Sequence, residues 1–159
     1  MKSFDDGRNR RQDWAINGRF LTQRMTGVQR YAFEIVASLD EICSENGDVA
    51  RRVGFRLVLP SGAGTTPALS HIDVCQTKFG SGHVWDQLVL PWHAGSGVLS
   101  LGNFGPVLAR NHILCIHDAN TFIEPESYSR AFGLAYRTLL PLIGRQASKV
   151  AAVRSFPRT

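Results

Sequence analysis

The sequence lacks several signatures that would narrow its function. It has no apolar run long enough to cross a membrane, and no apolar segment of a secretory signal follows its basic start, MKSFDDGRNRR. The motifs Gly-x-Ser-x-Gly of hydrolases, Gly-x-x-x-x-Gly-Lys of phosphate loops and, after the first expected strand, Gly-x-Gly-x-x-Gly of dinucleotide sites are also absent. These absences disfavour hydrolase, kinase and dinucleotide-dependent functions, and they predict a cytoplasmic protein.

Cysteine is scarce, and its distribution is informative. The chain has three cysteines, Cys43, Cys75 and Cys115, which is an odd number without a close pair. This distribution argues against a disulfide framework and fits a reducing compartment, in which each cysteine is expected to be a small core residue.

The composition is that of one folded domain with uneven charge. The 159 residues are 43% hydrophobic and 19% charged, which is too apolar for disorder. The net charge is +5: residues 1–30 carry seven basic and three acidic side chains, residues 31–129 carry five and ten, and residues 130–159 carry six and none. Basic ends suggest attraction to anionic lipid headgroups or phosphorylated ligands. A solvated basic face is the alternative, and no basic-aromatic motif indicates nucleic acid.

The first third of the chain has the clearest secondary-structure signals. Residues 13–20 are expected to form a strand that leaves through a turn. Thr26 and Gln29 have capping-box spacing, so a helix is expected to start near Gly27. Apolar residues then recur every three or four positions up to a stop at residues 46–47, which predicts one long amphipathic helix.

Short apolar runs and turn residues alternate through the remaining sequence. Strands are expected over residues 55–60, 72–77, 97–101, 112–117 and 149–153. Two more helices are expected, one over residues 84–93 closed by Pro91 and a longer one that starts at Ser129 and bends at Pro141. This alternation predicts an α/β fold with a mostly parallel sheet and helices on both faces.

Ligands of such sheets bind beyond the carboxyl ends of the strands. The segments that follow the expected strands are residues 18–27, 103–106, 117–120 and Ser155. Residues 112–117 are the most apolar short run, as expected for a central parallel strand. His117 and Asp118 should therefore lie on this rim.

A series of short strings carries a family resemblance. They are NGRF at 17–20, TGVQRY at 26–31, SLGNFGP at 100–106, IHDA at 116–119, PE at 125–126, YS at 128–129 and YRTLLPL at 136–142. In order and spacing, the strings resemble the N-terminal, acceptor-side half of GT-B glycosyltransferases of family 4, over residues 14–156. The resemblance implies a Rossmann-like domain over residues 13–159, preceded by a basic tail at 1–12.

Two features differ from the family pattern. The chain has Arg154 and Pro157 where such proteins have the two serines of a Val-Ser-x-Phe-Ser string. The donor-binding domain of the family is not among these 159 residues, so the resemblance implies a truncated or frameshifted fragment that is inactive alone.

The resemblance implies transfer of a sugar from a nucleotide-sugar donor to a saccharide or lipid-linked acceptor, in glycan synthesis at the inner membrane surface. In such a reaction a diphosphate leaves an oxocarbenium-like centre, so the enzyme must stabilise phosphate charge and place the acceptor hydroxyl. A non-catalytic Rossmann-like binding module and a basic nucleic-acid-binding domain are the alternatives. The second is disfavoured, and salt-sensitive affinity would reveal it.

Six residues are candidates for the site. Gly27 and Val28 open the first helix, where free N–H groups favour an anion and glycine lets phosphate approach. Arg30 could support the same phosphate or be a surface arginine, and Asn103 could bind an acceptor hydroxyl or serve its turn. The resemblance implies that His117 contacts the transferred sugar or its transition state and that Asp118 orients the acceptor or the loop. A backbone-bonded strand end and a turn cap are their structural alternatives.

Neither a metal nor a cofactor is predicted. Cys115 and His117 alternate along a strand near His112 and Asp118, but no second pair of ligands at zinc spacing exists. The remaining histidines, which are His71, His83 and His93, are expected to be surface or loop residues.

Overall fold

The computed structural model describes residues 10–117, 138 and 140–152. Strands and helices alternate along them. The elements are β1 (Gln12–Asn17), the 3-10 helix η2 (Gly18–Thr22), α1 (Gly27–Glu45), α2 (Gly47–Arg52), β2 (Val53–Leu59), β3 (Asp73–Gln76), α3 (Gly82–Leu88), the 3-10 helix η3 (Leu90–His93), β4 (Gly97–Ser100), β5 (His112–Ile116) and β6 (Lys149–Ala152). Thr138 and residues 140–146 are also helical.

The strands form one sheet in the order β3-β2-β1-β4-β5-β6, and every neighbouring pair is parallel. β1 lies between β2 and β4, with Ile16 opposite Leu57 on one side and Leu99 on the other. The chain thus builds outward from β1 to β3, crosses back to β4 and builds outward again. This order is typical of doubly wound dinucleotide-binding sheets, so the predicted α/β class is confirmed as a Rossmann-like fold.

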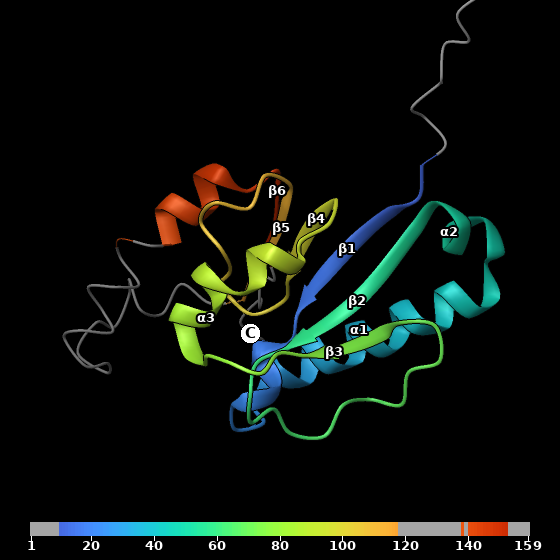
Figure 1. Cartoon of the computed structure of the whole chain (residues 1–159), viewed down its shortest axis with the longest axis horizontal. Helices are drawn as coiled ribbons and strands as arrows, with labels where there is room; N and C mark the ends of the chain where they lie inside the picture. Colours follow the sequence, from blue (N-terminus) through green and yellow to red (C-terminus); the bar gives the residue numbers. More distant parts are fainter. Residues whose placement is uncertain (1–9, 118–137, 139, 153–159) are drawn as a thin grey trace, which may run out of the picture.

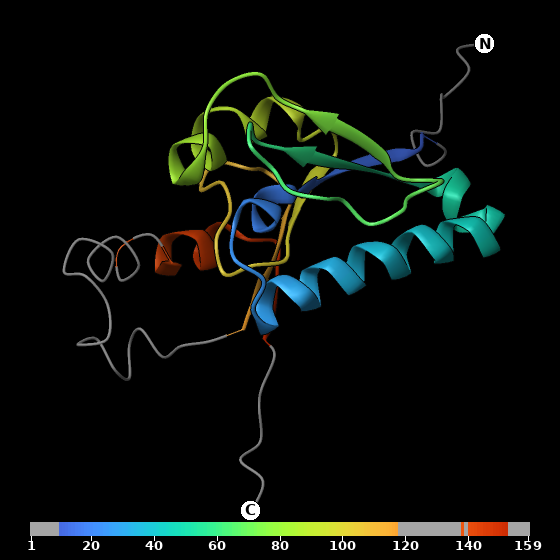
Figure 2. The same ribbon diagram turned by 90° about the horizontal axis from the view of Figure 1, so that it is seen from below.

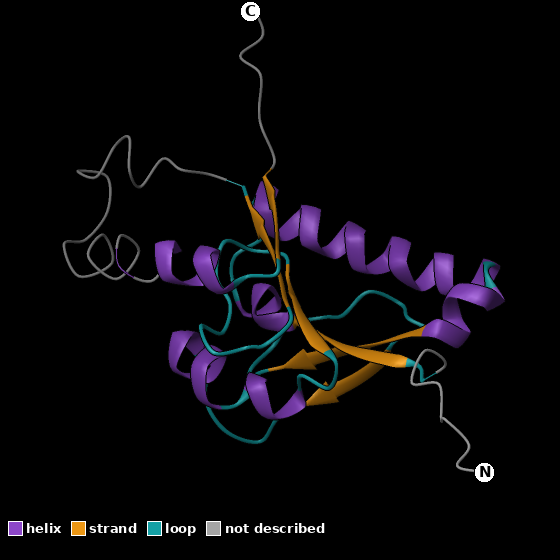
Figure 3. Ribbon diagram, turned by 90° about the horizontal axis from the view of Figure 1, so that it is seen from above, coloured by secondary structure: helices purple, strands orange, loops and turns teal. Residues whose placement is uncertain are grey.

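Helices cover both faces of the sheet (Figures 1 and 2). Ile16 packs with Val36 of α1 in one core cluster, whereas the preceding residue, Ala15, packs with Trp85 of α3 in another. Neighbouring residues of a strand point to opposite faces, so the two clusters lie on opposite sides of the sheet. Figure 3 shows α1 and α3 separated by the strands.

A buried carboxylate ties α1 to the start of β3. Asp40 of α1 accepts hydrogen bonds from the backbone N–H groups of Ser70, His71 and Ile72 at 2.9, 2.7 and 2.7 Å. Burial alone would raise the pKa of Asp40, but the three donors outweigh burial and hold it below its usual value. The end of the long segment between β2 and β3 is fixed in this way.

Two expectations near the N-terminus are corrected. The first strand ends at Asn17 rather than at residue 20, because the Asn17 side chain accepts the N–H of Arg19 at 3.1 Å and turns the chain into η2. The Asn46 side chain accepts the N–H groups of Asp48 and Val49. Residues 46–47 therefore end α1, as expected, but also start the unpredicted α2.

The helix expected over residues 84–93 is two shorter helices, α3 and η3. Pro91 has no N–H with which to continue the α-helix beyond Leu88, and it lies instead in the first turn of η3, a position that proline favours. The expected start of the last helix, Ser129, lies outside the described residues, and Pro141 lies within the helical residues 140–146. No helix in the described ranges has the length and apolar character needed to cross a membrane.

His112, the first residue of β5, is completely buried. Its Nε2 lies 2.9 Å from Oγ of Ser100 on β4, while its Nδ1 has no hydrogen-bond partner among the described atoms. Gly105 packs so closely on this pair that a Cβ atom there would overlap both side chains. Burial lowers the pKa of His112 to about 4, against a smaller opposing effect of Asp86, so the ring is neutral near pH 7.

We expect His112 to make the stability of the fold fall with acid. The unfolded chain protonates this ring near pH 6.5 and the folded protein only near pH 4, so proton uptake favours unfolding between these values. The free energy of unfolding should fall by up to about 3 kcal/mol over this interval. Urea unfolding at a series of pH values should show a weaker slope for His112→Gln than for the wild type. His71→Gln, at an exposed histidine, should keep the full slope, and equal slopes for all three proteins would contradict the prediction.

Candidate functional site

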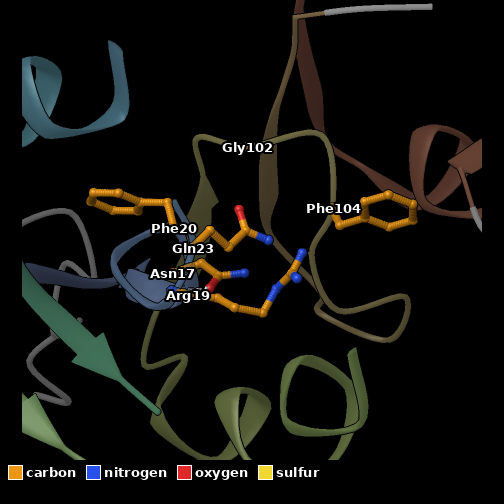
Figure 4. Close-up of a pocket in the computed structure, with 6 residues that line it drawn as sticks. All are labelled: Asn17, Arg19, Phe20, Gln23, Gly102 and Phe104. Carbon is orange, nitrogen blue, oxygen red and sulfur yellow. Dashed lines mark hydrogen bonds between the residues drawn. The ribbon is translucent and has the colours of Figure 1, made fainter. Parts of the chain in front are cut away.

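A small pocket lies where the strand order reverses, beyond the carboxyl ends of β1 and β4. Its volume is about 10 Å³, room for about one water molecule, and its lining residues are Asn17, Arg19, Phe20, Gln23, Gly102 and Phe104. Figure 4 shows the polar ends of Asn17, Arg19 and Gln23 close together, between the rings of Phe20 and Phe104. This reversal point is the general ligand position in open α/β sheets.

A buried ion pair builds one wall of this pocket. Nε of Arg19 lies 2.7 Å from Oδ2 of Asp86, and the Asn17 side chain donates to Oδ1 of the same carboxylate at 3.0 Å. Asp86 is fully buried and Arg19 is 8% exposed. The contacts join the turn after β1 to α3, which lie far apart in the sequence. Local patterns did not indicate this pair, and only the family-like string at 17–20 contained Arg19.

Residues of the loop after β4 contact the pocket and His117 in turn. Gly102 and Phe104 line the pocket. The residues beside them hold His117: its Nε2 lies 2.7 Å from the carbonyl oxygen of Leu101, and its backbone N–H donates to Oδ1 of Asn103 at 2.7 Å. Asn103 adopts the left-handed region, with φ 47°, which asparagine tolerates better than most residues. One loop therefore connects the pocket to the end of β5.

His117 is placed as the sequence predicted, directly after β5, and its ring is half-buried. Because a carbonyl oxygen only accepts, Nε2 must carry the proton in the contact with Leu101. Nδ1 of a neutral ring is then an acceptor, and it has no partner within the described ranges. The His117 ring also meets the Tyr31 ring edge-on, with 4.6 Å between centroids. Asp118, its predicted companion, lies outside the described residues, as does Ser155.

The start of α1 belongs to the same rim as His117. Tyr31, one turn into α1, makes the ring contact just described, and a Cβ atom on Gly102 would lie 3.8 Å from Val28. Gly27 is exposed, and no atom lies within 4 Å of the place where its Cβ would be, so the helix start is open. The backbone N–H of Thr26 donates to Oε1 of Gln29 at 3.3 Å, which agrees with the predicted helix start.

Neither Arg30 nor Asn103 lines the pocket. Arg30 is exposed beside Met25, Phe33 and Glu34 and does not line the pocket. The side-chain oxygen of Asn103 accepts the backbone N–H of His117, so Asn103 connects the turn after β4 to the end of β5.

His83 and Cys75 differ from the expectations for them. His83 lies on α3, where its ring meets that of Phe104 at 4.6 Å and its Nδ1 lies 3.5 Å from Oδ2 of Asp86, so it is more than a surface residue. Cys43 and Cys115 are buried as expected, but Cys75 is only half-buried. Among the described residues, no three side chains of His, Cys, Asp or Glu are grouped to hold a metal ion.

A comparison of the chain with protein-family models, with curated proteins and with solved structures finds no match. The α/β class rests on the order of the strands and on their parallel pairing. The similarity to family 4 glycosyltransferases stays a prediction from the sequence strings.

Removing one partner of the buried ion pair should destabilise the protein more than replacing both. Asp86→Ala leaves Arg19 buried without a counter-charge and should lower the free energy of unfolding by about 3 to 5 kcal/mol. The double variant Arg19→Met with Asp86→Leu should be more stable than Asp86→Ala, because no buried charge remains. Chemical denaturation of the wild type, Arg19→Met, Asp86→Leu and the double variant measures this coupling, with Asp86→Ala compared alongside.

The exposed pair between Asp48 and Arg51 provides the control for this cycle. Asp48→Ala should change the free energy of unfolding by no more than about 1 kcal/mol. If the double variant loses as much stability as its single changes added together, Arg19 and Asp86 do not depend on each other.

Proposed function

We propose that this domain binds the acceptor of a glycosyl transfer at the switch-point pocket, and that His117 and the start of α1 contact the sugar and phosphate of a nucleotide-sugar donor. The observation that carries the proposal is the loop after β4. Gly102 and Phe104 of this loop line the pocket, and Leu101 and Asn103 of the same loop hold His117, so one segment supports both the pocket and the imidazole. The reaction would serve glycan synthesis at the cytoplasmic side of a membrane.

The chemistry of the lining residues suits a saccharide. Hydroxyl groups of a sugar need both donors and acceptors. The guanidinium of Arg19 and the amide nitrogen of Gln23 offer donors, and the Gln23 oxygen, which already accepts from Gln29, keeps a second lone pair, while the Asn17 amide is committed to Arg19 and Asp86. The rings of Phe20 and Phe104 add apolar surface for the C–H faces of a sugar ring. The pocket itself has room for about one water molecule, so a sugar unit of the acceptor would lie across its mouth, on the polar ends of these side chains.

His117 and the helix start suit the other half of the reaction. With Nε2 committed to Leu101, Nδ1 of His117 can accept a hydroxyl proton or a hydrogen bond near the reacting carbon. The open start of α1 at Gly27 can receive phosphate oxygens on backbone N–H groups. Most of the affinity for the donor would come from a second domain, as the family resemblance implies.

Saccharide binding should be visible in the chain as it stands. Titration of ¹⁵N-labelled protein with a panel of methyl glycosides and disaccharides should shift the amide signals of Gly102, Asn103, Phe104 and His117. The amides near Gly95, at the opposite end of the sheet, should not move. Shifts confined to that opposite end, or none with any sugar, would contradict the proposed acceptor site.

Turnover tests the role of His117 separately from binding. In an enzyme that joins this domain to a donor-binding half, His117→Ala should lower turnover at least about tenfold, because an acceptor for the hydroxyl proton is lost. Its circular dichroism and melting temperature should stay close to those of the wild type. His93→Ala on η3, beside the amino ends of the strands, is the matched control and should keep full activity. Unchanged turnover in His117→Ala would count against the assignment of His117 to the catalytic site.

A further inference from the structure

Three buried polar atoms meet beside the switch-point pocket without a hydrogen bond. They are Nε of Arg19, Oδ2 of Asp86 and Nδ1 of His83, and none of them has a hydrogen-bond partner among the described residues. Oδ2 lies 2.7 Å from Nε and 3.5 Å from Nδ1, but neither contact has the geometry of a hydrogen bond. Buried polar atoms are almost always hydrogen-bonded, and exceptions are common where a protein binds a ligand or an ion.

His83 is connected to the pocket through two of its lining residues. Its ring meets the ring of Phe104 edge-on, with 4.6 Å between centroids, and its Nδ1 shares Oδ2 of Asp86 with Arg19. The side chain of His83 is 37% exposed, although its Nδ1 is buried. An imidazole that turns Nδ1 to a buried carboxylate keeps Nε2 for a ligand.

The guanidinium of Arg19 offers further donors at the same place. Its Nε contacts Asp86, and no hydrogen bond joins its two terminal nitrogens to any other described residue. Figure 4 shows the guanidinium extended between Gln23 and the loop that carries Phe104. The terminal nitrogens of arginine form a planar fork that matches the oxygens of a carboxylate or phosphate group.

The charges around Asp86 leave room for one more negative group when His83 is protonated. Arg19 and Asp86 cancel each other, and residues 14–33 and 74–117, which include every lining residue, contain no other acidic side chain. His112 is also near Asp86, but burial lowers its pKa to about 4 against a smaller opposing effect of Asp86, so it is neutral near pH 7. A protonated His83 therefore adds a positive charge that an anionic ligand can neutralise.

We propose that the switch-point pocket binds an oxyanion, which is a carboxylate or phosphate group, on Arg19 and His83. The pocket has room for about one water molecule, which is also the size of one oxygen of such a group, so the rest of the ligand stays at the mouth. Arg19 donates from its terminal nitrogens and His83 from Nε2, while Asp86 faces Nδ1. That the oxyanion belongs to a sugar rests on the proposed function, and the acceptor is then an acidic or phosphorylated saccharide.

Three sugars with the same ring test the preference for an oxyanion. Methyl glucuronide has a carboxylate where methyl glucoside has a hydroxymethyl group, and methyl glucoside 6-phosphate has a phosphate there. In titrations followed at the amide signals of Gly102 and Phe104, a charged sugar should bind about tenfold more tightly than methyl glucoside, because hydrogen bonds to a charged group are added. The charged sugar that binds more tightly identifies the oxyanion as a carboxylate or as a phosphate.

The variant His83→Gln tests the imidazole by a readout that a purely structural role would not change. Binding of methyl glucuronide to the wild type should weaken as the pH rises from about 6 to about 8, because His83 loses its proton while the carboxylate stays ionised. This pH dependence should be lost in His83→Gln, in which Arg19, Asp86 and His117 are retained. His93→Gln on η3 is the matched control and should keep it, and circular dichroism should show that both variants fold.

The same titrations distinguish this proposal from that of a sugar site. Equal affinity for all three sugars, with shifts at Gly102 and Phe104, would overturn the oxyanion proposal and leave the sugar site intact. Shifts of these amides with sodium sulfate, but with none of the sugars, would support the oxyanion site and contradict the proposed acceptor. Unchanged pH dependence in His83→Gln would remove His83 from the site. The absence of any shift, with sulfate or with a sugar, would overturn both proposals.

Discussion

The buried charge pair between Arg19 and Asp86 is the constraint on which the candidate site depends. A carboxylate without access to water is stable only when paired, so α3 must stay where Asp86 can reach the turn after β1. The Asn17 amide satisfies the second oxygen of the carboxylate. The turn that follows the central strand and the helix on one face of the sheet are thereby fixed relative to each other, and the pocket forms at their junction.

The loop after β4 fixes the end of the neighbouring strand, β5, relative to the pocket. Its carbonyl oxygen at Leu101 and its side chain at Asn103 both hold His117. A histidine held at two atoms has a defined ring position, which is a requirement for any role in binding or proton transfer. The same contacts also satisfy a plain structural role, so the geometry makes His117 available for chemistry without requiring it.

Sequence alone predicted the fold better than the site. The capping residues and apolar stripe of α1 are local signals, and they gave its first residue correctly. The double use of Asn46 and the division of residues 84–93 were missed, because one polar or proline residue can end one element and start another. The pair of Arg19 with Asp86 is a contact across the fold between residues far apart in the sequence, and no local period reveals it. The position of His117 directly after β5 was predicted because it ends an apolar run.

The central place of β1 has a consequence for how the protein is made. β2 and β3 follow β1 closely in the sequence and can complete one edge of it early, but β4 is the partner of the other edge and emerges from the ribosome much later. Until then, the nascent chain presents an unpaired central strand, which is a template for pairing with another chain. A chain with this strand order therefore needs the open edge of β1 to be protected while it is synthesised.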